Sequence, residues 1–251
     1  MLPTQRFSNR VENYIKYRPS YPAAVIDGLK ADCQLTPQAV VADVGSGTGL
    51  LSQLFLANGN TVFGVEPNAE MRAAGENLLH AYAGFISVDG AAEATTLAAE
   101  QVDFVTAGQA FHWFEAELAL PEFRRILKPQ GWMVLVWNER QPDDPFQAAY
   151  EQLLRRHSPE YSAVSHKRID EPALAELMGP GLRRAVLDND QVLDYDGIKG
   201  RLLSASYAPL AGEAGHQAML EELQALYEQH QAQGRVRFSY KTKVYYAQRQ
   251  R

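Results

Sequence analysis

The chain has 251 residues, 46% of them hydrophobic and 22% charged, with a formal net charge of −6. This composition is that of an ordinary globular protein and excludes a disordered or collagen-like chain. The acidic balance disfavours nucleic acid as a partner, and the single cysteine, Cys33, excludes an internal disulfide and a cysteine-based zinc site, so we expect no metal. With no apolar signal core in the first ten residues and no apolar run of about 18 residues, we expect a cytoplasmic protein without a membrane span.

Short β-rich runs alternate with longer helical segments over the first 140 residues. This alternation is typical of βαβ units, so it predicts a parallel sheet within an α/β fold. The expected strands cover residues 40–44, 61–66, 84–89, 102–108 and 131–137.

Three helices are expected between these strands. Leucines and Phe55 recur at helical intervals after residue 50, and the pattern stops at the Asn58-Gly59 pair. The second helix begins after Asn68, whose side chain can cap it, and runs to about Leu79. The third covers residues 117–127 and stops at the KPQG motif.

Beyond residue 140 the pattern becomes mostly helical as far as residue 234, with one strand predicted at residues 184–192. We interpret this part as an insertion or lid with late core elements. The segment RVRFSYKTKVYY, residues 235–246, alternates basic and apolar side chains, which predicts a half-buried final strand.

The stretch VVADVGSGTGLL places five small residues, 45–49, between an apolar strand and a helix. Backbone amides and the positive end of a helix face an open crevice in such a turn, so a polar ligand is expected there. A nucleoside triphosphate requires Gly-Lys-Ser/Thr, which is absent. A dinucleotide loop would have glycine where Leu50 stands, which weakens that alternative without excluding it.

Two acids adjoin this loop. Asp43 lies two residues before Gly45, where a negative charge would repel a pyrophosphate and favour a cationic ligand such as S-adenosylmethionine. Glu66 ends the next strand, at a spacing that suits the ribose hydroxyls of either nucleoside cofactor.

The chain resembles the class I S-adenosylmethionine-dependent methyltransferases from about Phe7 to Glu139. Within that family it is similar to the small-molecule branch that contains the trans-aconitate methyltransferase-like proteins. The segments that carry the resemblance are FSNRVENYIKYRPSYP, VADVGSGTG, GVEPN, DGAAEA, AGQAFHWF and LKPQGWMVLVWNER.

This resemblance implies a Rossmann-like, doubly wound sheet of seven strands, mostly parallel with an antiparallel last strand, and a helical insertion after the fifth strand. A single methyltransferase domain is expected over residues 1–251. Its parts are a helical cover (1–35), the cofactor-binding core (36–140), the insertion or lid (141–234) and the final strand (235–251).

The resemblance also implies which residues hold the cofactor. The loop would line the methionine and ribose, Glu66 would accept the ribose hydroxyls, and residues after it would flank the adenine. In DGAAEA, Ala91 stands where many relatives have Asp, and Asp89 lies two residues earlier, so the partner of the adenine amino group stays open. The expected cofactor-binding residues are Tyr14, Arg18, Asp43, Gly45, Ser46, Gly47, Glu66, Pro67, Asn68, Met71, Gly90, Ala91, Ala92, Gln109 and Phe111.

Residues 108–114, GQAFHWF, follow the fourth strand and are expected to border the transferred methyl group. Phe111 and Trp113 can shield a sulfonium, although at least one of them is expected to belong to the core. His112 is the candidate general base, unless the acceptor is a carboxylate, which needs alignment only. Arg18 could clasp the cofactor's carboxylate, and Tyr14 could close over it.

The predicted function is therefore methyl transfer from S-adenosylmethionine to a small molecule, first of all to oxygen of a carboxylate or hydroxyl. The alternatives are a module that binds this cofactor without catalysis and an NAD-dependent oxidoreductase. The sequence leaves the acceptor and the oligomeric state open.

Overall fold

The fold is that of a computed structural model, which describes residues 16–141, 143–158, 161, 171–205 and 207–249. The strands are β1 (Val40–Val44), β2 (Thr61–Val65), β3 (Phe85–Val88), β4 (Val102–Gly108), β5 (Leu127–Arg140), β6 (Arg183–Leu193) and β7 (Val236–Gln248). The helices are α2 (Ala24–Cys33), α3 (Ser52–Ala57), α4 (Ala69–Leu79), the short η3 (Phe111–Trp113), α5 (Ala116–Ile126), α6 (Pro145–His157), α8 (Glu171–Met178), α9 (Tyr195–Leu203) and α10 (His216–His230).

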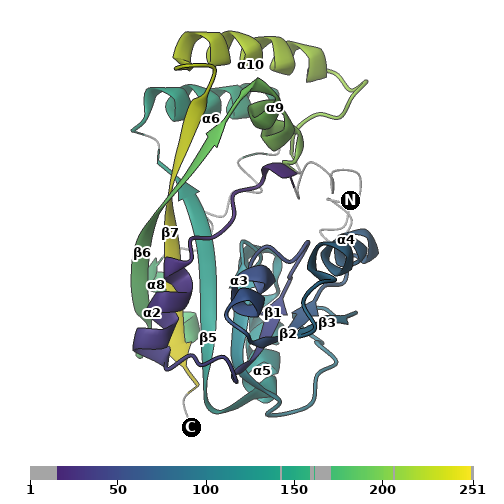
Figure 1. Ribbon diagram of the computed structural model, residues 1–251, viewed down its shortest axis with the longest axis vertical. Coiled ribbons are helices and arrows are strands. Elements are labelled where there is room, and N and C mark those ends of the chain that lie inside the picture. Colours follow the sequence, from purple (N-terminus) through teal and green to yellow (C-terminus); the bar gives the residue numbers. More distant parts are fainter. Residues whose placement is uncertain (1–15, 142, 159–160, 162–170, 206, 250–251) are drawn as a thin grey trace.

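All these strands form one seven-stranded sheet in the order β3-β2-β1-β4-β5-β7-β6 (Figure 1). β1 to β5 pair in parallel, whereas β7 is antiparallel to both of its neighbours, β5 and β6. The predicted α/β fold with a mostly parallel sheet and an antiparallel last strand is confirmed. Among the described residues no helix combines the length and apolarity that crossing a bilayer requires.

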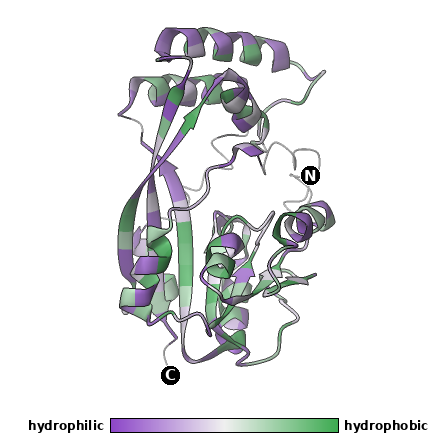
Figure 2. Ribbon diagram, viewed as in Figure 1, coloured by the Kyte–Doolittle hydropathy of each residue, from purple (hydrophilic) through white to green (hydrophobic). Residues whose placement is uncertain are grey.

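Helices cover the sheet on both faces. Successive strand residues point to opposite sides, so Val41 packs with α2, α3 and α4 while Ala42 packs with α5 and α8. Central parallel strands buried on both sides read as near-continuous apolar runs, which is why β1 and β4 were evident from the sequence. Figure 2 shows the hydrophobic colour over the lower part of β5 and the hydrophilic colour at its upper end.

A third layer, which we call the cap, consists of α6, α9 and α10. It lies over the upper ends of β5, β6 and β7 (Figure 1). β5 has 14 residues and β7 has 13, against 5 in β1, so these strands extend past the middle of the sheet and carry the cap. Its apolar core joins Tyr150, Ile198 and Leu223 from the three helices to Phe238 of β7. The mostly helical segment after residue 140 thus divides between the cap and the sheet layers, to which α8 and β6 belong.

The start of α4 and the end of α5 can be compared with the boundaries predicted from the sequence. The Asn68 side chain accepts a hydrogen bond from the Met71 amide at 2.9 Å, so the prediction that Asn68 is the N-terminal capping residue of α4 is confirmed. The third helix, α5, runs over Ala116–Ile126, and β5 begins directly at Leu127. The KPQG motif is therefore the irregular start of a strand, with a register shift against β4, since Pro129 cannot continue a helix but is tolerated at a bulge.

Candidate functional site

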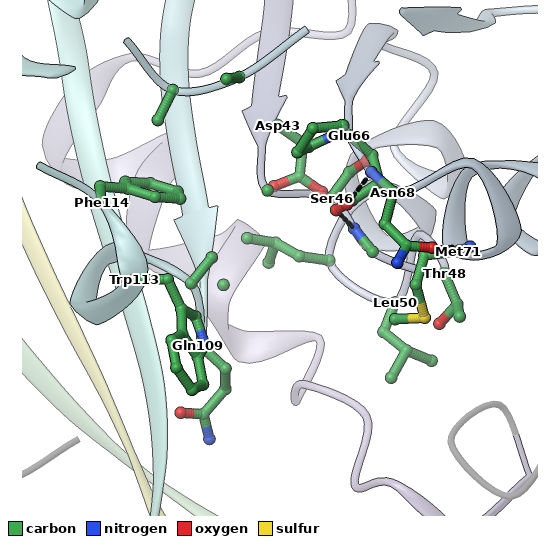
Figure 3. Close-up of a pocket in the computed structure, with 18 of the residues that line it drawn as sticks. Asp43, Ser46, Thr48, Leu50, Glu66, Asn68, Met71, Gln109, Trp113 and Phe114 are labelled. Carbon is green, nitrogen blue, oxygen red and sulfur yellow. Dashed lines mark hydrogen bonds between the residues drawn. The ribbon is translucent and has the colours of Figure 1, made fainter. Parts of the chain in front are cut away.

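A cleft opens at the carboxyl ends of β1, β2 and β4, where ligands of open α/β sheets bind (Figure 3). Its lining combines the glycine loop, the end of β2, the start of α4, the loop after β3 and the segment after β4. The lining residues are Tyr21, Asp43, Gly45, Ser46, Gly47, Thr48, Leu50, Leu51, Glu66, Pro67, Asn68, Met71, Ala91, Ala92, Glu93, Gly108, Gln109, Ala110, Trp113 and Phe114.

The glycine loop needs glycine for two separate reasons. Gly45 has φ +66°, and a Cβ there would lie 2.7 Å from the Cβ of Ala110, so a side chain would close the cleft. Gly49 has φ +85°, and a Cβ there would overlap the side chain of Leu79 in α4. Gly45 thus keeps the cleft open, whereas Gly49 lets α4 approach the loop.

The amides of this loop are turned toward the protein. Gly45 and Ser46 both donate to the Val65 carbonyl, at 2.8 and 3.2 Å, and Gly49 donates to the Ser46 carbonyl at 2.9 Å. Gly47 donates to Oε2 of Glu66 at 2.9 Å. The expectation that loop amides face the crevice is wrong for these four. Val65 of β2 and Glu66 after it accept the hydrogen bonds of three of them, and Ser46 within the loop accepts that of Gly49.

Glu66 lies at the end of β2 and is almost fully buried, with 8% of its surface exposed. Besides the Gly47 amide on Oε2, its Oε1 accepts the amide of Asn68 at 2.9 Å. Burial raises the pKa of this carboxyl, and the two amide hydrogen bonds oppose that rise. Glu66 therefore couples the glycine loop to the start of α4.

Asp43 is completely buried in β1. Its carboxylate accepts the hydroxyls of Ser52 at 2.6 Å and of Thr106 at 3.2 Å. Burial raises its pKa to about 6. Among the described residues, no lysine or arginine lies within 4.0 Å of the carboxylate of Asp43 or Glu66. The base of the cleft thus carries two buried acids that form no salt bridge among the described residues. The nearest cation to act on Glu66 is Arg72, which donates to the main-chain carbonyl of Glu66 at 2.8 Å and lowers the pKa of its carboxyl.

Eleven of the residues predicted to bind a cofactor line this cleft, and their role stays a prediction. They are Asp43, Gly45, Ser46, Gly47, Glu66, Pro67, Asn68, Met71, Ala91, Ala92 and Gln109.

The other predicted residues lie elsewhere. Gly90 packs against the backbone, since a Cβ there would lie 2.8 Å from the Thr95 carbonyl. Phe111 is in the core with 1% exposure, which fits the expectation that one of the two aromatic residues is core. Arg18 donates to the Ser204 carbonyl of the cap at 3.1 Å. Tyr14 lies outside the described residues.

The segment after β4 begins with an unusual backbone. Gln109 has φ +55°, a left-handed backbone conformation that is rare for residues other than glycine and asparagine. Its amide donates to Val136 at 2.9 Å and its side chain to the Asn138 carbonyl at 3.0 Å, which holds it beside β5. Trp113 and Phe114 line the cleft after it, whereas His112 packs on Trp113 and is not a lining residue.

The predicted adenine side has two acids to compare. The side chain of Asp89 is 73% exposed and pairs with Arg72 at 3.1 Å, outside the cleft lining. Glu93, which sequence reasoning did not select, does line the cleft beside Ala91 and Ala92.

Several lining residues were missed. Thr48, Leu50 and Leu51 follow the glycine loop directly, so their position in the chain was a usable signal. Tyr21 gave none: it arrives from the N-terminal segment, and a Cβ on Gly108 would lie 2.7 Å from its hydroxyl oxygen. Such a long-range contact has no local sequence pattern.

Comparisons with known proteins agree with this geometry. Residues 42–135 match the family model described as a methyltransferase domain. The chain is 32% identical over 154 residues to an uncharacterized methyltransferase of Schizosaccharomyces pombe, a match that covers 60% of this chain and 59% of that protein. The chain therefore spans well under two thirds of that relative.

Two solved structures share the fold. A provisionally designated type II methyltransferase from Anaeromyxobacter dehalogenans superposes with a TM-score of 0.66 at 20% identity, covering 92% of this chain and 98% of that one. Geranyl diphosphate C-methyltransferase from Streptomyces coelicolor, solved with S-adenosylhomocysteine, gives 0.51 at 15% identity, covering 91% and 76%. Over residues 42–135 the sequence thus matches a methyltransferase domain, and over the whole sheet the fold is the one that these two methyltransferase structures share.

Proposed function

We propose that the protein is an enzyme that transfers the methyl group of S-adenosylmethionine to an oxygen of a small molecule, a carboxylate or a hydroxyl. The observation that carries this proposal is the pair of buried acids, Asp43 and Glu66, on either side of the glycine loop. Burying an unpaired carboxylate is costly, so an arrangement that keeps two of them favours a cationic ligand. The cofactor's ammonium and sulfonium groups supply that charge.

The hydrogen-bonding capacity of both acids fits this cofactor. Each carboxylate oxygen offers about two acceptor sites. Each oxygen of Glu66 accepts one backbone amide, whereas the Asp43 carboxylate accepts the hydroxyls of Ser52 and Thr106 and also the backbone amide of Ser52. Sites remain on Glu66 for ribose hydroxyls and on Asp43 for the ammonium, directly or through water. Met71 and the backbone of Ala92 border the region assigned to the adenine ring.

The same geometry speaks against a dinucleotide. A pyrophosphate binds through loop amides that point outward, whereas the amides of Gly45, Ser46, Gly47 and Gly49 donate within the protein. The buried acids would also repel its negative charge. The S-adenosylhomocysteine bound to the geranyl diphosphate C-methyltransferase supports the nucleoside cofactor instead.

Methyl transfer needs alignment and exclusion of water rather than a reactive side chain. Gln109, fixed to β5 by two hydrogen bonds, shapes the end of the cleft, and the rings of Trp113 and Phe114 enclose it. Aromatic faces stabilise a neighbouring sulfonium. A carboxylate acceptor is already an anion and needs no base, which agrees with the position of His112 outside the lining.

A small acceptor also agrees with the charges on β7. Its basic residues are paired with acids: Lys241 with Asp188, and Lys243 with Glu139 at 2.7 Å. These pairs leave little net positive charge along the strand for a phosphate backbone.

Two measurements test the proposal. Calorimetry should show binding of S-adenosylhomocysteine and none of NADH, and the reverse result would replace the proposal with an oxidoreductase. A metabolite extract incubated with methyl-labelled cofactor should yield a labelled product. A label released by mild base identifies a methyl ester, and a base-stable label identifies an ether. Cofactor binding without any labelled product would instead support the non-catalytic module.

A further inference from the structure

Two arginines lie inside the cap, away from the cofactor cleft. Arg140 is the last residue of β5, and 19% of its side chain is exposed. Arg201 comes from α9 and is 6% exposed. Arginines this deep in a protein are uncommon unless they are paired. The groups that contact each guanidinium therefore decide whether the two arginines keep an uncompensated positive charge.

Arg140 is paired. Its guanidinium donates to the Glu151 carboxylate at 2.7 Å and to the hydroxyl of Tyr161 at 2.6 Å. Glu151 also pairs with the exposed Arg155 at 3.4 Å. One carboxylate thus serves two cations.

Arg201 has no acid. Its Nε donates to the Tyr240 hydroxyl at 2.7 Å, and its guanidinium lies over the rings of Phe238 and Tyr240, at 5.4 and 5.5 Å from their centroids. Within the part of the chain that the structure describes, no carboxylate lies within 4.0 Å of this guanidinium. A desolvated cation held only by a hydroxyl and two rings is poorly compensated, and packing does not require it.

Both guanidinium groups belong to one aromatic cluster. Arg140 lies 5.5 Å from the ring of Tyr150, which packs edge-on against Phe238 at 5.1 Å. In the strand register Arg140 is also directly opposite Tyr240, the partner of Arg201. Among the described residues the two arginines share one acid, Glu151, so the pair has a positive charge to spare.

Hydrogen bonds along β5 connect the neighbourhood of this cluster with the lining of the cofactor cleft. Gln109, which lines the cleft, donates to the carbonyl of Asn138, two residues before Arg140 and on the same face of β5. The Asn138 side chain in turn donates to the Ser20 carbonyl, next to the cleft residue Tyr21. Arg140 lies four residues beyond Val136, which accepts the Gln109 amide, or about 13 Å along the strand.

We propose that Arg140 and Arg201 bind an anionic group of the methyl acceptor, a carboxylate or a phosphate, at the end remote from the methylated atom. Guanidinium groups bind both anions through parallel charged hydrogen bonds. About 13 Å of β5 separates Val136, at the cleft, from Arg140, so the acceptor should be an extended molecule. This inference rests on the proposed methyltransferase function.

The main test compares Arg201→Met with the wild type. The matched control is Arg155→Met, which removes an exposed arginine near the same acid; its side chain is 61% exposed. With methyl-labelled cofactor and a metabolite extract, we expect wild type and R155M to label an acceptor that an anion-exchange resin retains. R201M should lose about 10- to 100-fold in rate, the loss expected for charged hydrogen bonds to a ligand. Its unfolding midpoint should not fall, because the variant removes a buried unpaired charge.

Two free anions serve as probes for the identity of the group. Succinate and inorganic phosphate, each compared with sodium chloride of equal ionic strength, should inhibit the wild type more than R201M, and the stronger inhibitor identifies a carboxylate or a phosphate. Equal rates for wild type and R201M, equal inhibition of both, or a labelled product that the resin does not retain would each overturn the inference. If one of these results is obtained, calorimetry with S-adenosylhomocysteine separates the two levels: when the wild type binds this compound, only the inference fails, and when the wild type does not bind it, the proposed function fails as well.

Discussion

The replacement Asp43→Asn should make the protein more stable and its cofactor affinity lower. Burial places the pKa of Asp43 at about 6 in the folded chain against 3.8 for the ordinary side chain. Each pH unit of displacement is worth about 1.4 kcal/mol, so ionising this carboxyl costs the folded state about 3 kcal/mol at neutral pH.

The sign follows from which state releases the proton first. Between pH 3.8 and about 6 the unfolded chain is ionised while the folded chain still holds the proton, so stability falls as pH rises through this window and stays lower above it. Asparagine keeps the shape and can still bond the hydroxyls of Ser52 and Thr106. We therefore expect D43N to gain about 1 to 3 kcal/mol at pH 7.5 and to lose this advantage near pH 4.

Cofactor binding should change in the opposite direction. Because the proposed function uses the Asp43 charge to bind the ammonium group, its loss should lower the affinity for S-adenosylhomocysteine about 10- to 100-fold. In the wild type, protonation of Asp43 should weaken binding as pH drops below about 6. Urea unfolding at both pH values and calorimetry measure these effects.

The control is Asp89→Asn, which removes a carboxylate whose side chain is 73% exposed and lies outside the cleft. It should shift stability by less than about 0.5 kcal/mol and leave affinity unchanged. A weaker affinity in D89N would instead assign that acid to the adenine amino group. The reasoning about Asp43 is refuted if D43N unfolds at lower urea than the wild type at pH 7.5, or binds the cofactor product equally well.

Three further replacements address other parts of the site. Glu66→Gln should weaken S-adenosylhomocysteine binding about 10- to 100-fold in calorimetry, and an unchanged affinity would remove Glu66 from the ribose site. Gly49→Ala should lower the free energy of unfolding, measured in urea, by about 2 to 4 kcal/mol, because φ is +85° at this position and a Cβ would overlap Leu79. The matched control, Gly28→Ala, lies in a helix with open space around it and should raise that free energy by about 0.5 to 1 kcal/mol. His112→Asn should keep kcat within about fivefold, and a loss of about 100-fold together with a flattened pH profile would establish it as the base.

Features set by neighbouring residues were predictable from the sequence. The glycine loop follows β1 directly, and Asp43 and Glu66 lie at the ends of β1 and β2. The hydrophobic periodicity of the strands and the spacing of the glycines therefore located all of them. The hydrogen bond by which Asn68 caps the N-terminus of α4 also joins residues close together in the sequence, so it was predictable too. In contrast, the direction of the loop amides depends on Glu66 and Val65 of a different strand, and no local pattern records that pairing.

Long-range contacts explain the remaining differences. The guanidinium of Arg18 donates to Ser204, a contact between residues 186 positions apart, and its predicted place at the cofactor carboxylate stays a prediction. Tyr21 reaches the cleft over Gly108 in the same way. The arginines of the cap carried no motif, and only the fold shows that Arg140 and Arg201 share one aromatic cluster.

The position of β7 in the sheet has a consequence for biosynthesis. This strand comes late in the sequence yet lies between β5 and β6, and its Phe238 and Tyr240 complete the core of the cap. On the ribosome, β1 to β4 can pair as soon as they emerge, whereas β5 keeps an open edge and β6 has no neighbour until β7 has been translated. The half that carries the glycine loop should therefore fold during synthesis, and the half that carries the cap should form last, with an interval in which chaperones would protect the exposed strand edge.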